Sequence, residues 1–240
     1  MGWELSADYR LRWMDFDRFG RLRPSCILDI FQDVATLQAN DMGIGRDDML
    51  AKDVFWAVIR QKYVVDRQPR HGEVLTARTW PHSPRRFSFM RDYSLADEEG
   101  NILVRGSSEW VLMDIRTRQL TPVEGKVDAP FDFCPERCFQ EKMRKLASFP
   151  LVGQPARATP STADIDVNGH VNNTRYAAYV EEALDLSEVE VASGLQMDYR
   201  QEALAGEELR LFTHRIGSEV DLVGISPTDE VSFACRLELR

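Results

Sequence analysis

The sequence predicts an α+β protein in which one structural unit is used twice. In each half of the chain, one amphipathic helical segment is followed by several strand-like segments, which is the pattern of a helix packed on one face of an antiparallel sheet. A short Asp-containing segment precedes the helix in both halves. Asp15 and Asp17 in the first half correspond to Asp164 and Asp166 in the second, with Gly20 matching Gly169.

The first unit is expected over residues 1–123. Apolar residues at helical spacing predict a helix over 27–37, with Ser25 as its N-cap and Gly43 just beyond its end. Alternation of apolar and polar residues predicts the strands that follow. These strands cover 55–66, 73–80, 86–96 and 102–115, and residues 99–101 form the hairpin turn between the last two.

Residues 124–155 are rich in proline and weakly periodic, which favours a linker with one short helix near 136–146. The second unit is expected over 156–240 and repeats the order of the first. A strand near 156–163 leads into the second Asp-containing segment, and a helix follows with Tyr176, Tyr179 and Val180 on one face. Strands are then predicted over 195–201, 207–216, 219–225 and 231–239.

Composition narrows the class of protein. The chain has 240 residues and a formal net charge of −9, which argues against general nucleic-acid binding. The first 30 residues carry no secretory signal pattern, and no apolar run is long enough to cross a membrane, so a cytoplasmic protein without membrane association is expected. Four cysteines are too few for a disulfide scaffold, and Cys134 and Cys138 lack a second ligand pair for zinc. No metal or cofactor is expected.

Residues 164–173 read Asp-Ile-Asp-Val-Asn-Gly-His-Val-Asn-Asn and lead directly into the second helix. Carboxylates can act as bases or nucleophiles, an imidazole can move protons, and an amide can hold a carbonyl group. Backbone N–H groups of Gly169 and Val171 at the helix start are candidate donors to an oxyanion. The first copy has Phe19 in place of Asn168 and Arg21 in place of His170, so hydrolytic chemistry is predicted for the second copy.

Two other interpretations compete for this segment. Its Asp, Asp, Asn and Gly match the first positions of a calcium-binding EF-hand loop, but Arg175 stands where that loop needs a bidentate glutamate. The polar residues could also serve only to cap the helix, a role for which Asn172 and Asn173 are suited. Asp164 is expected to be structural, because its counterpart Asp15 persists in the copy that lacks the other groups.

The motif Asp-x-Asp-Val-Asn-x-His-Val-Asn-Asn, followed by a Tyr-containing helix, resembles the signature of the fatty acyl–acyl carrier protein thioesterases of plants and bacteria. Two segments of the first half resemble the same family: residues 56–67, which are followed by Pro69 and Gly72, and residues 105–113. The resemblance implies two hotdog units in tandem, each with a long helix wrapped by an antiparallel sheet. It also implies that the first half lines the acyl chain's tunnel, for which 27–37 and Trp56 are candidates.

The resemblance further implies a catalytic set made of Asp166, Asn168, His170 and Glu202, the last of which follows the family's Tyr-Arg-x pattern at 199–201. Plant members have a cysteine directly after this acid, whereas this chain has Ala203, which excludes a cysteine nucleophile at that position. The implied reaction is hydrolysis of an acyl thioester to a fatty acid and a thiol carrier. Whether Glu202 or Asp166 activates water or attacks directly stays open at this point.

The implied partner is acyl carrier protein, an acidic protein that presents the acyl group on a phosphopantetheine arm. Residues 78–91 contain four arginines and no acid, so Arg85, Arg86 and Arg91 are the candidate docking residues, although a solvated strand surface explains them equally well. Three other functions compete: an acyl-coenzyme A thioesterase, a dehydratase on the same scaffold, and a non-catalytic acyl-binding protein. The sequence fixes neither the acyl chain length nor the oligomeric state, and a homodimer is compatible with it.

Overall fold

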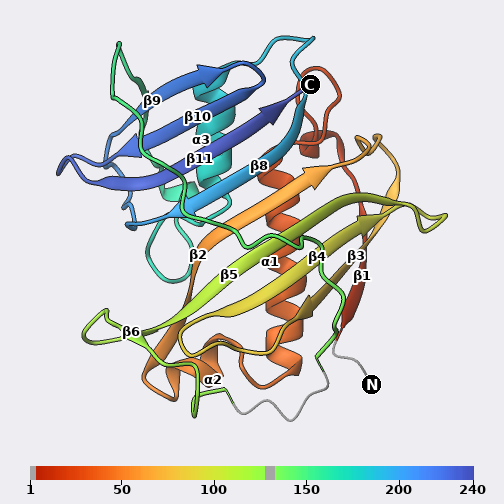
Figure 1. Cartoon of the computed structure of the whole chain (residues 1–240), viewed down its shortest axis with the longest axis vertical. Coiled ribbons are helices and arrows are strands. Elements are labelled where there is room, and N and C mark those ends of the chain that lie inside the picture. Colours follow the sequence, from red (N-terminus) through yellow and green to blue (C-terminus); the bar gives the residue numbers. More distant parts are fainter. Residues whose placement is uncertain (1–3, 128–132) are drawn as a thin grey trace.

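The computed structural model describes residues 4–127 and 133–240. Within them, one antiparallel sheet runs through the whole molecule, and the long helices α1 and α3 lie on the same face of it (Figure 1). The strand order is β1-β3-β4-β5-β2-β8-β11-β10-β9-β7, with β6 paired to β5. No helix in these ranges has the length and apolar character that a membrane span requires.

Each half of the chain supplies one helix and one half of the sheet. The N-terminal unit contains β1 (Leu5–Arg10), a 3-10 turn η1 (Trp13–Asp15), α1 (Pro24–Asp41), α2 (Arg46–Leu50), β2 (Val54–Val65), β3 (Val74–Pro81), β4 (Phe89–Ala96), β5 (Ile102–Asp114) and β6 (Leu120–Thr121). The C-terminal unit contains β7 (Ala156–Ala158), η2 (Thr162–Asp164), α3 (Arg175–Leu184), β8 (Ala192–Tyr199), β9 (Leu209–Ile216), β10 (Glu219–Ile225) and β11 (Val231–Leu239).

The two units meet where β2 pairs with β8, in a register that opposes Arg60 to Asp198 and Val64 to Gly194. Arg60 Nε lies 3.0 Å from an oxygen of the buried Asp198, and Arg60 Nη1 lies 2.8 Å from Glu109 of β5. A charged group this deep in a protein is tolerated because it is paired and hydrogen-bonded. The ion pairs at the junction and the continuous strand ladder therefore join the halves into one sheet.

The core of the N-terminal unit lies between α1 and the sheet. Phe31 of α1 stacks on Tyr93 of β4 with ring centroids 4.4 Å apart. Gly106 of β5 faces the same ring, and a Cβ at this position would come within 2.1 Å of Phe31 Cε2. A residue with a side chain would displace the helix from the sheet, so the glycine permits the close approach. In the C-terminal unit, Tyr176 of α3 packs on Phe233 of β11.

Most predicted strands are observed with shifts of a few residues at their ends. The strand predicted over 156–163 is wrong beyond Ala158, where β7 ends, and Thr162–Asp164 form the 3-10 turn η2. The helix ends differ for identifiable reasons. Helix α1 begins at Pro24 with Arg23 as N-cap, because proline suits the first helical position, so the prediction of Ser25 as N-cap was wrong. The backbone N–H and the hydroxyl of Ser25 both donate to Glu181 of α3, each at 3.1 Å. Helix α3 is preceded by Thr174 rather than capped by Asn172 or Asn173. Asn172 Oδ1 instead accepts hydrogen bonds from the backbone and hydroxyl of Thr174.

The helix expected near 136–146 does not form. This part of the chain runs without helix or strand across the sheet face opposite α1 and α3 (Figure 1). The sheet holds it through single hydrogen bonds: Cys138 N donates to Asp92 at 2.8 Å, and Leu146 N donates to Asp198 at 2.7 Å. These buried carboxylates on β4 and β8 take the backbone donors that a helix would have used internally.

Candidate active site

The loop between η2 and α3 is a tight turn closed by its own backbone. Ile165 and Val171 form an antiparallel bridge, Asp166 N donates to the carbonyl of His170 at 2.9 Å, and Gly169 N donates to the carbonyl of Asp166 at 3.0 Å. Gly169 has φ +84°, which glycine adopts at little cost. These hydrogen bonds fix the backbone that carries the side chains of residues 166, 168 and 170.

Asp166 organises this turn. Its carboxylate accepts a hydrogen bond from the backbone N–H of Asn168 at 2.8 Å and another from Asn168 Nδ2 at 3.3 Å. An amide has two N–H donors. One of them is engaged with Asp166, and the other is a candidate donor to a substrate carbonyl oxygen.

His170 and Glu202 are in direct contact, with Nε2 of the imidazole 3.1 Å from Oε2 of the carboxylate. Glu202 lies in the segment that follows β8, and two hydrogen bonds of Ala203 tie this segment to the loop and to α3. Val171 N donates to the carbonyl of Ala203 at 3.0 Å, and Ala203 N donates to the hydroxyl of Tyr176 at 3.1 Å. Burial raises the pKa of Tyr176 to about 12, so its hydroxyl is neutral and serves as a stable acceptor. The structure therefore brings together Asp166, Asn168, His170 and Glu202.

The oxyanion donors predicted from the sequence are wrong. The N–H of Gly169 is bonded to the carbonyl of Asp166, and the N–H of Val171 is bonded to the carbonyl of Ala203. Both groups are therefore engaged within the protein. The tight turn and the pairing with the segment after β8 consume the donors that a free helix start would offer.

The N-terminal unit contributes two arginines that sequence reasoning missed. Arg46, the first residue of α2, donates from Nε to Asn168 Oδ1 at 3.2 Å. Arg118, in the turn between β5 and β6, has Nη1 3.5 Å from Glu202 Oε1. Both lie far from the motif in sequence and belong to no recognisable pattern, so only the folded arrangement reveals them.

Asp164 has the structural role expected of it. Its carboxylate accepts from the backbone and hydroxyl of Ser161 at 2.8 and 2.9 Å, and Arg175 Nε lies 2.9 Å away. Burial acts to raise the pKa of Asp164, but these hydrogen bonds and the guanidinium lower it below its ordinary value. Arg175 thus neutralises a carboxylate that a calcium loop would need. Across 4–127 and 133–240, no cluster of three or more His, Cys, Asp or Glu side chains could hold a metal ion.

The first copy of the loop repeats the backbone geometry of the second. Asp17 N donates to the carbonyl of Arg21 at 2.8 Å, Gly20 N donates to the carbonyl of Asp17 at 3.0 Å, and Phe19 N donates to the Asp17 carboxylate at 2.8 Å. Phe16 and Leu22 form the matching bridge. The predicted internal repeat is therefore confirmed at the level of individual hydrogen bonds.

The repeat also identifies the counterpart of Glu202. The N–H groups of residues 66 and 67 donate to one carbonyl of β5, as those of 200 and 201 donate to one carbonyl of β11. Gln68 therefore stands where the second copy has Glu202. Its amide accepts from Leu22 N and donates to the carbonyl of Ala192, each at 3.2 Å. The first copy has neither the histidine nor the acid, so it lacks a counterpart of the His170–Glu202 pair.

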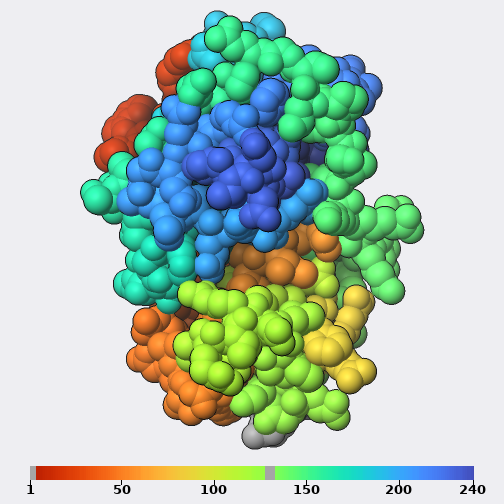
Figure 2. Space-filling model, turned by 90° about the vertical axis from the view of Figure 1, so that its left-hand side faces the viewer, coloured from red at the N-terminus to blue at the C-terminus, as the bar shows by residue number. Residues whose placement is uncertain are grey.

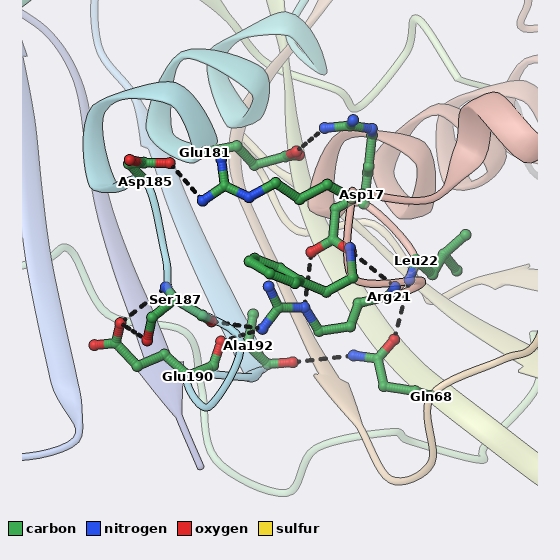
Figure 3. A network of polar contacts seen from close by, with 12 residues as sticks. Asp17, Arg21, Leu22, Gln68, Glu181, Asp185, Ser187, Glu190 and Ala192 are labelled. Carbon is green, nitrogen blue, oxygen red and sulfur yellow. Dashed lines mark hydrogen bonds and ion pairs between the residues drawn. The ribbon is translucent and has the colours of Figure 1, made fainter.

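In the first copy of the loop, the corresponding side chains make polar contacts with the C-terminal unit (Figure 3). Arg21 Nε lies 2.7 Å from Asp17 Oδ2, and Arg21 Nη1 donates to the carbonyls of Ser187 and Glu190 in the C-terminal unit. Arg18 pairs with Asp185 at 3.0 Å. Beside these contacts lies a cavity of about 250 Å³ with a largely apolar lining that includes Leu22, Val180 and Leu184. We call the contacts of Asp17 and Arg21 the inter-unit clamp.

Removing the clamp should destabilise the protein. We expect Arg21→Ala to lower the free energy of unfolding by about 2–4 kcal/mol, because it breaks a mostly buried ion pair and leaves two carbonyls of the C-terminal unit without their donor. Urea denaturation followed by circular dichroism measures this loss. Arg18→Ala is the matched control: its pair with Asp185 is exposed, so its loss should stay within about 0.5 kcal/mol.

At acid pH, the difference in the free energy of unfolding between the parent and Arg21→Ala should become smaller. Burial acts to raise the pKa of Asp17, but hydrogen bonds from the backbone and side chain of Arg21 lower it below its ordinary value. The stabilisation from a depressed carboxyl pKa is present above the unfolded value of about 4 and is lost as the pH falls through the folded value. A loss of stability on Arg21→Ala that is equal at neutral and strongly acid pH would contradict the clamp.

The candidate docking residues divide into two groups. Arg91 is buried on β4, where its guanidinium donates to Gln38 and, at 3.1 Å, to Thr79, and burial lowers its pKa. Arg91 therefore faces α1 and is not available to a partner, which corrects its assignment as a docking residue. Arg85 and Arg86 lie exposed in the connection between β3 and β4, and Arg86 covers the ring of Phe87.

Comparison with known families identifies the class of this fold and site. The model of the acyl-ACP thioesterase N-terminal domain matches residues 3–131, and that of the acyl-ACP thioesterase C-terminal domain matches residues 154–240. The chain belongs to the acyl-ACP thioesterase family.

Curated relatives and solved structures agree with this placement. The chloroplastic palmitoyl-acyl carrier protein thioesterase of Gossypium hirsutum is 34% identical over 65% of this chain and 40% of its own length. The chloroplastic oleoyl-acyl carrier protein thioesterase 1 of Arabidopsis thaliana is 31% identical over 73% of this chain and 54% of its own length. The chain spans about half the length of the curated relatives it matches.

Two solved structures establish the fold. The 12:0-ACP thioesterase from Umbellularia californica superposes with a TM-score of 0.87 at 23% identity, covering 100% of this chain and 98% of that one. An acyl-ACP thioesterase from Bacteroides thetaiotaomicron gives a TM-score of 0.83 at 22% identity, covering 99% and 98%. The tandem hotdog architecture expected from the sequence is thereby confirmed.

Proposed function

We propose that this protein hydrolyses the thioester of acyl-[acyl carrier protein], releasing a free fatty acid and ending the growth of the acyl chain. The observation that carries the proposal is the contact of His170 with Glu202, in a loop whose Asn168 amide is ordered by Asp166. The first copy of the loop has neither the histidine, the acid nor the asparagine. Membership of the acyl-ACP thioesterase family supports the same substrate class. The reaction consumes only water, and the His170–Glu202 pair supplies its acid–base chemistry.

The geometry favours Glu202 over Asp166 as the base. Glu202 is half exposed and in direct contact with the imidazole that passes the proton on, whereas the carboxylate of Asp166 orders the backbone and amide of Asn168. Glu202 takes a proton from a water molecule, whose oxygen forms the new bond to the carbonyl carbon. The Nδ2 group of Asn168 donates to the oxygen that becomes negative.

Collapse of the tetrahedral species breaks the carbon–sulfur bond. The proton taken from water passes from Glu202 across the 3.1 Å contact to His170, which delivers it to the departing thiolate. The products are the fatty acid and the free thiol of the carrier. Asp166 holds Asn168 in place throughout and takes no proton.

The test is to supply the purified protein with acyl-ACP and acyl-coenzyme A that carry the same acyl chain, over a series of chain lengths. We expect equal amounts of free thiol and free fatty acid, with a higher kcat/KM for the carrier protein substrate. Faster hydrolysis of the coenzyme A thioester would make the protein an acyl-coenzyme A thioesterase. A change in the acyl group without thiol release would indicate a dehydratase, and tight retention of ligand without turnover would indicate an acyl-binding protein.

Docking of the acidic carrier is proposed to use Arg85 and Arg86, which provide local positive charge on a chain of net charge −9. We expect reversal of both to glutamate to raise KM for acyl-ACP severalfold and to leave hydrolysis of a small uncharged thioester unchanged. Added salt should narrow the difference, because attraction between exposed charges is screened over about 8 Å at physiological ionic strength. Reversal of Arg10 and Arg70 to glutamate, both exposed and outside this segment, makes the same change in net charge and is the control. Equal losses on both substrates would show that the arginines support the fold instead.

A further inference from the structure

We propose that Arg118 of the N-terminal unit is a positioning residue for catalysis in the C-terminal unit: it holds Glu202 in the orientation that meets His170. The inference deepens the proposed function and rests on it. Figure 2 shows the yellow-green β5–β6 region of the N-terminal unit directly against the blue C-terminal unit on one face of the molecule, and Arg118 makes its contact with Glu202 across this boundary.

The backbone at Arg118 adopts a conformation that favours glycine. The turn from β5 to β6 is fixed by Asp114, whose carboxylate accepts from the N–H groups of Arg116 and Thr117 at 3.0 and 2.7 Å. Arg118 N donates to the carbonyl of Asp114 at 3.0 Å, and Arg118 has φ +55°. Left-handed backbone is unfavourable for a residue with a Cβ, and residues held there collect at functional sites. An arginine at this position indicates that its side chain is needed.

The side chain of Arg118 packs on an aromatic ring before it reaches Glu202. The guanidinium of Arg118 lies over the ring of Phe55 on β2, 4.9 Å from the centroid. From there Nη1 reaches Oε1 of Glu202, while Oε2 of the same carboxylate meets His170. The carboxylate is thus held from both sides. Arg118 and Glu202 are each about half exposed, at 53% and 50%.

Exposed ion pairs contribute little to folding. The effect of this one therefore lies in geometry. A half-exposed glutamate has several accessible rotamers, and only those that keep Oε2 beside the imidazole allow the proton to pass. With Arg118 in place, Oε1 has a fixed cationic partner and the productive rotamer is favoured. Without it, rotamers that turn the carboxylate into solvent gain population.

The test separates activity from stability at one position. We expect Arg118→Gly to lower kcat for acyl-ACP hydrolysis severalfold, up to about fivefold, with little change in KM, because an exposed ion pair biases the rotamer of the base only modestly and the misplaced base affects the chemical step and not binding. The thermal midpoint should stay unchanged or rise, because glycine relieves the left-handed backbone. Arg118→Lys, which keeps a cation without the planar guanidinium, should retain an intermediate kcat. Arg116→Ala in the same turn removes an equal charge without contact to Glu202 and should match the parent.

A parent-like kcat for Arg118→Gly would overturn the proposal. A fall in kcat accompanied by a fall of several degrees in the thermal midpoint would also overturn it, since that would show a purely structural role. The activity of the parent tests the proposed function, which fails if the parent releases no thiol from any acyl-ACP. The ratio of variant to parent kcat tests only the role of Arg118.

Discussion

The His170→Ala protein should release thiol from acyl-ACP on the order of 10²–10⁴-fold more slowly than the parent, because the thiolate then departs without a proton donor. The His170 side chain is 20% exposed, so truncating it removes packing as well as the proton donor. The thermal midpoint should therefore fall somewhat, while the protein stays folded at the assay temperature. The measurement is kcat from thiol release, with circular dichroism on the same preparation. A folded His170→Ala protein with near-parent activity would remove the imidazole from the mechanism.

Glu202→Gln should cause a loss of similar size, about 10²–10⁴-fold in kcat, because the amide has the shape of the acid but cannot take a proton from water. The residue is half exposed, so stability should change by less than about 0.5 kcal/mol. The informative comparison is Asp166→Asn, which keeps an oxygen that can accept from Asn168 N. If Glu202 is the base, Asp166→Asn retains considerably more activity than Glu202→Gln. The reverse order would assign the base to Asp166.

Much of the fold could be predicted from the sequence because its signals are local. Apolar spacing marks the helices and strands, and the Asp-x-Asp…Gly pattern marks both copies of the loop. The reason is visible in the structure: the aspartate at the third position binds backbone N–H groups within its own turn in each copy, at Asp17 and at Asp166. A motif that satisfies its own hydrogen bonds is recognisable in a single sequence.

One error could have been avoided from the sequence alone. Phe89, Tyr93 and Leu95 occupy alternate positions of a strand whose apolar face was recognised, and Arg91 shares their parity. Because side chains alternate across a strand, Arg91 had to face the helix with them. Of the four arginines in residues 78–91, Arg85 and Arg86 lie in the connection between the strands, whereas Arg78 lies in β3 and Arg91 in β4.

Other features depend on contacts that no local pattern encodes. Arg46 and Arg118 reach the site only because the N-terminal unit packs against the catalytic loop. The helix expected near 136–146 is lost because Asp92 and Asp198, remote in sequence, bind its backbone donors. The prediction of Val171 as an oxyanion donor is wrong for the same reason, because its N–H donates to the carbonyl of Ala203, which follows β8. Tertiary hydrogen bonds override local propensity in each case.

The central claim is that one of two equivalent loops carries the chemistry and the other holds the units together. The ratio of kcat for His170→Ala to kcat for Arg21→Ala tests it most directly, measured on acyl-ACP at a temperature where both proteins are folded. The account predicts a ratio on the order of 10⁻²–10⁻⁴, because residue 170 handles the proton while Arg21 contributes to stability. A ratio near one, with both variants folded and both impaired, would contradict it.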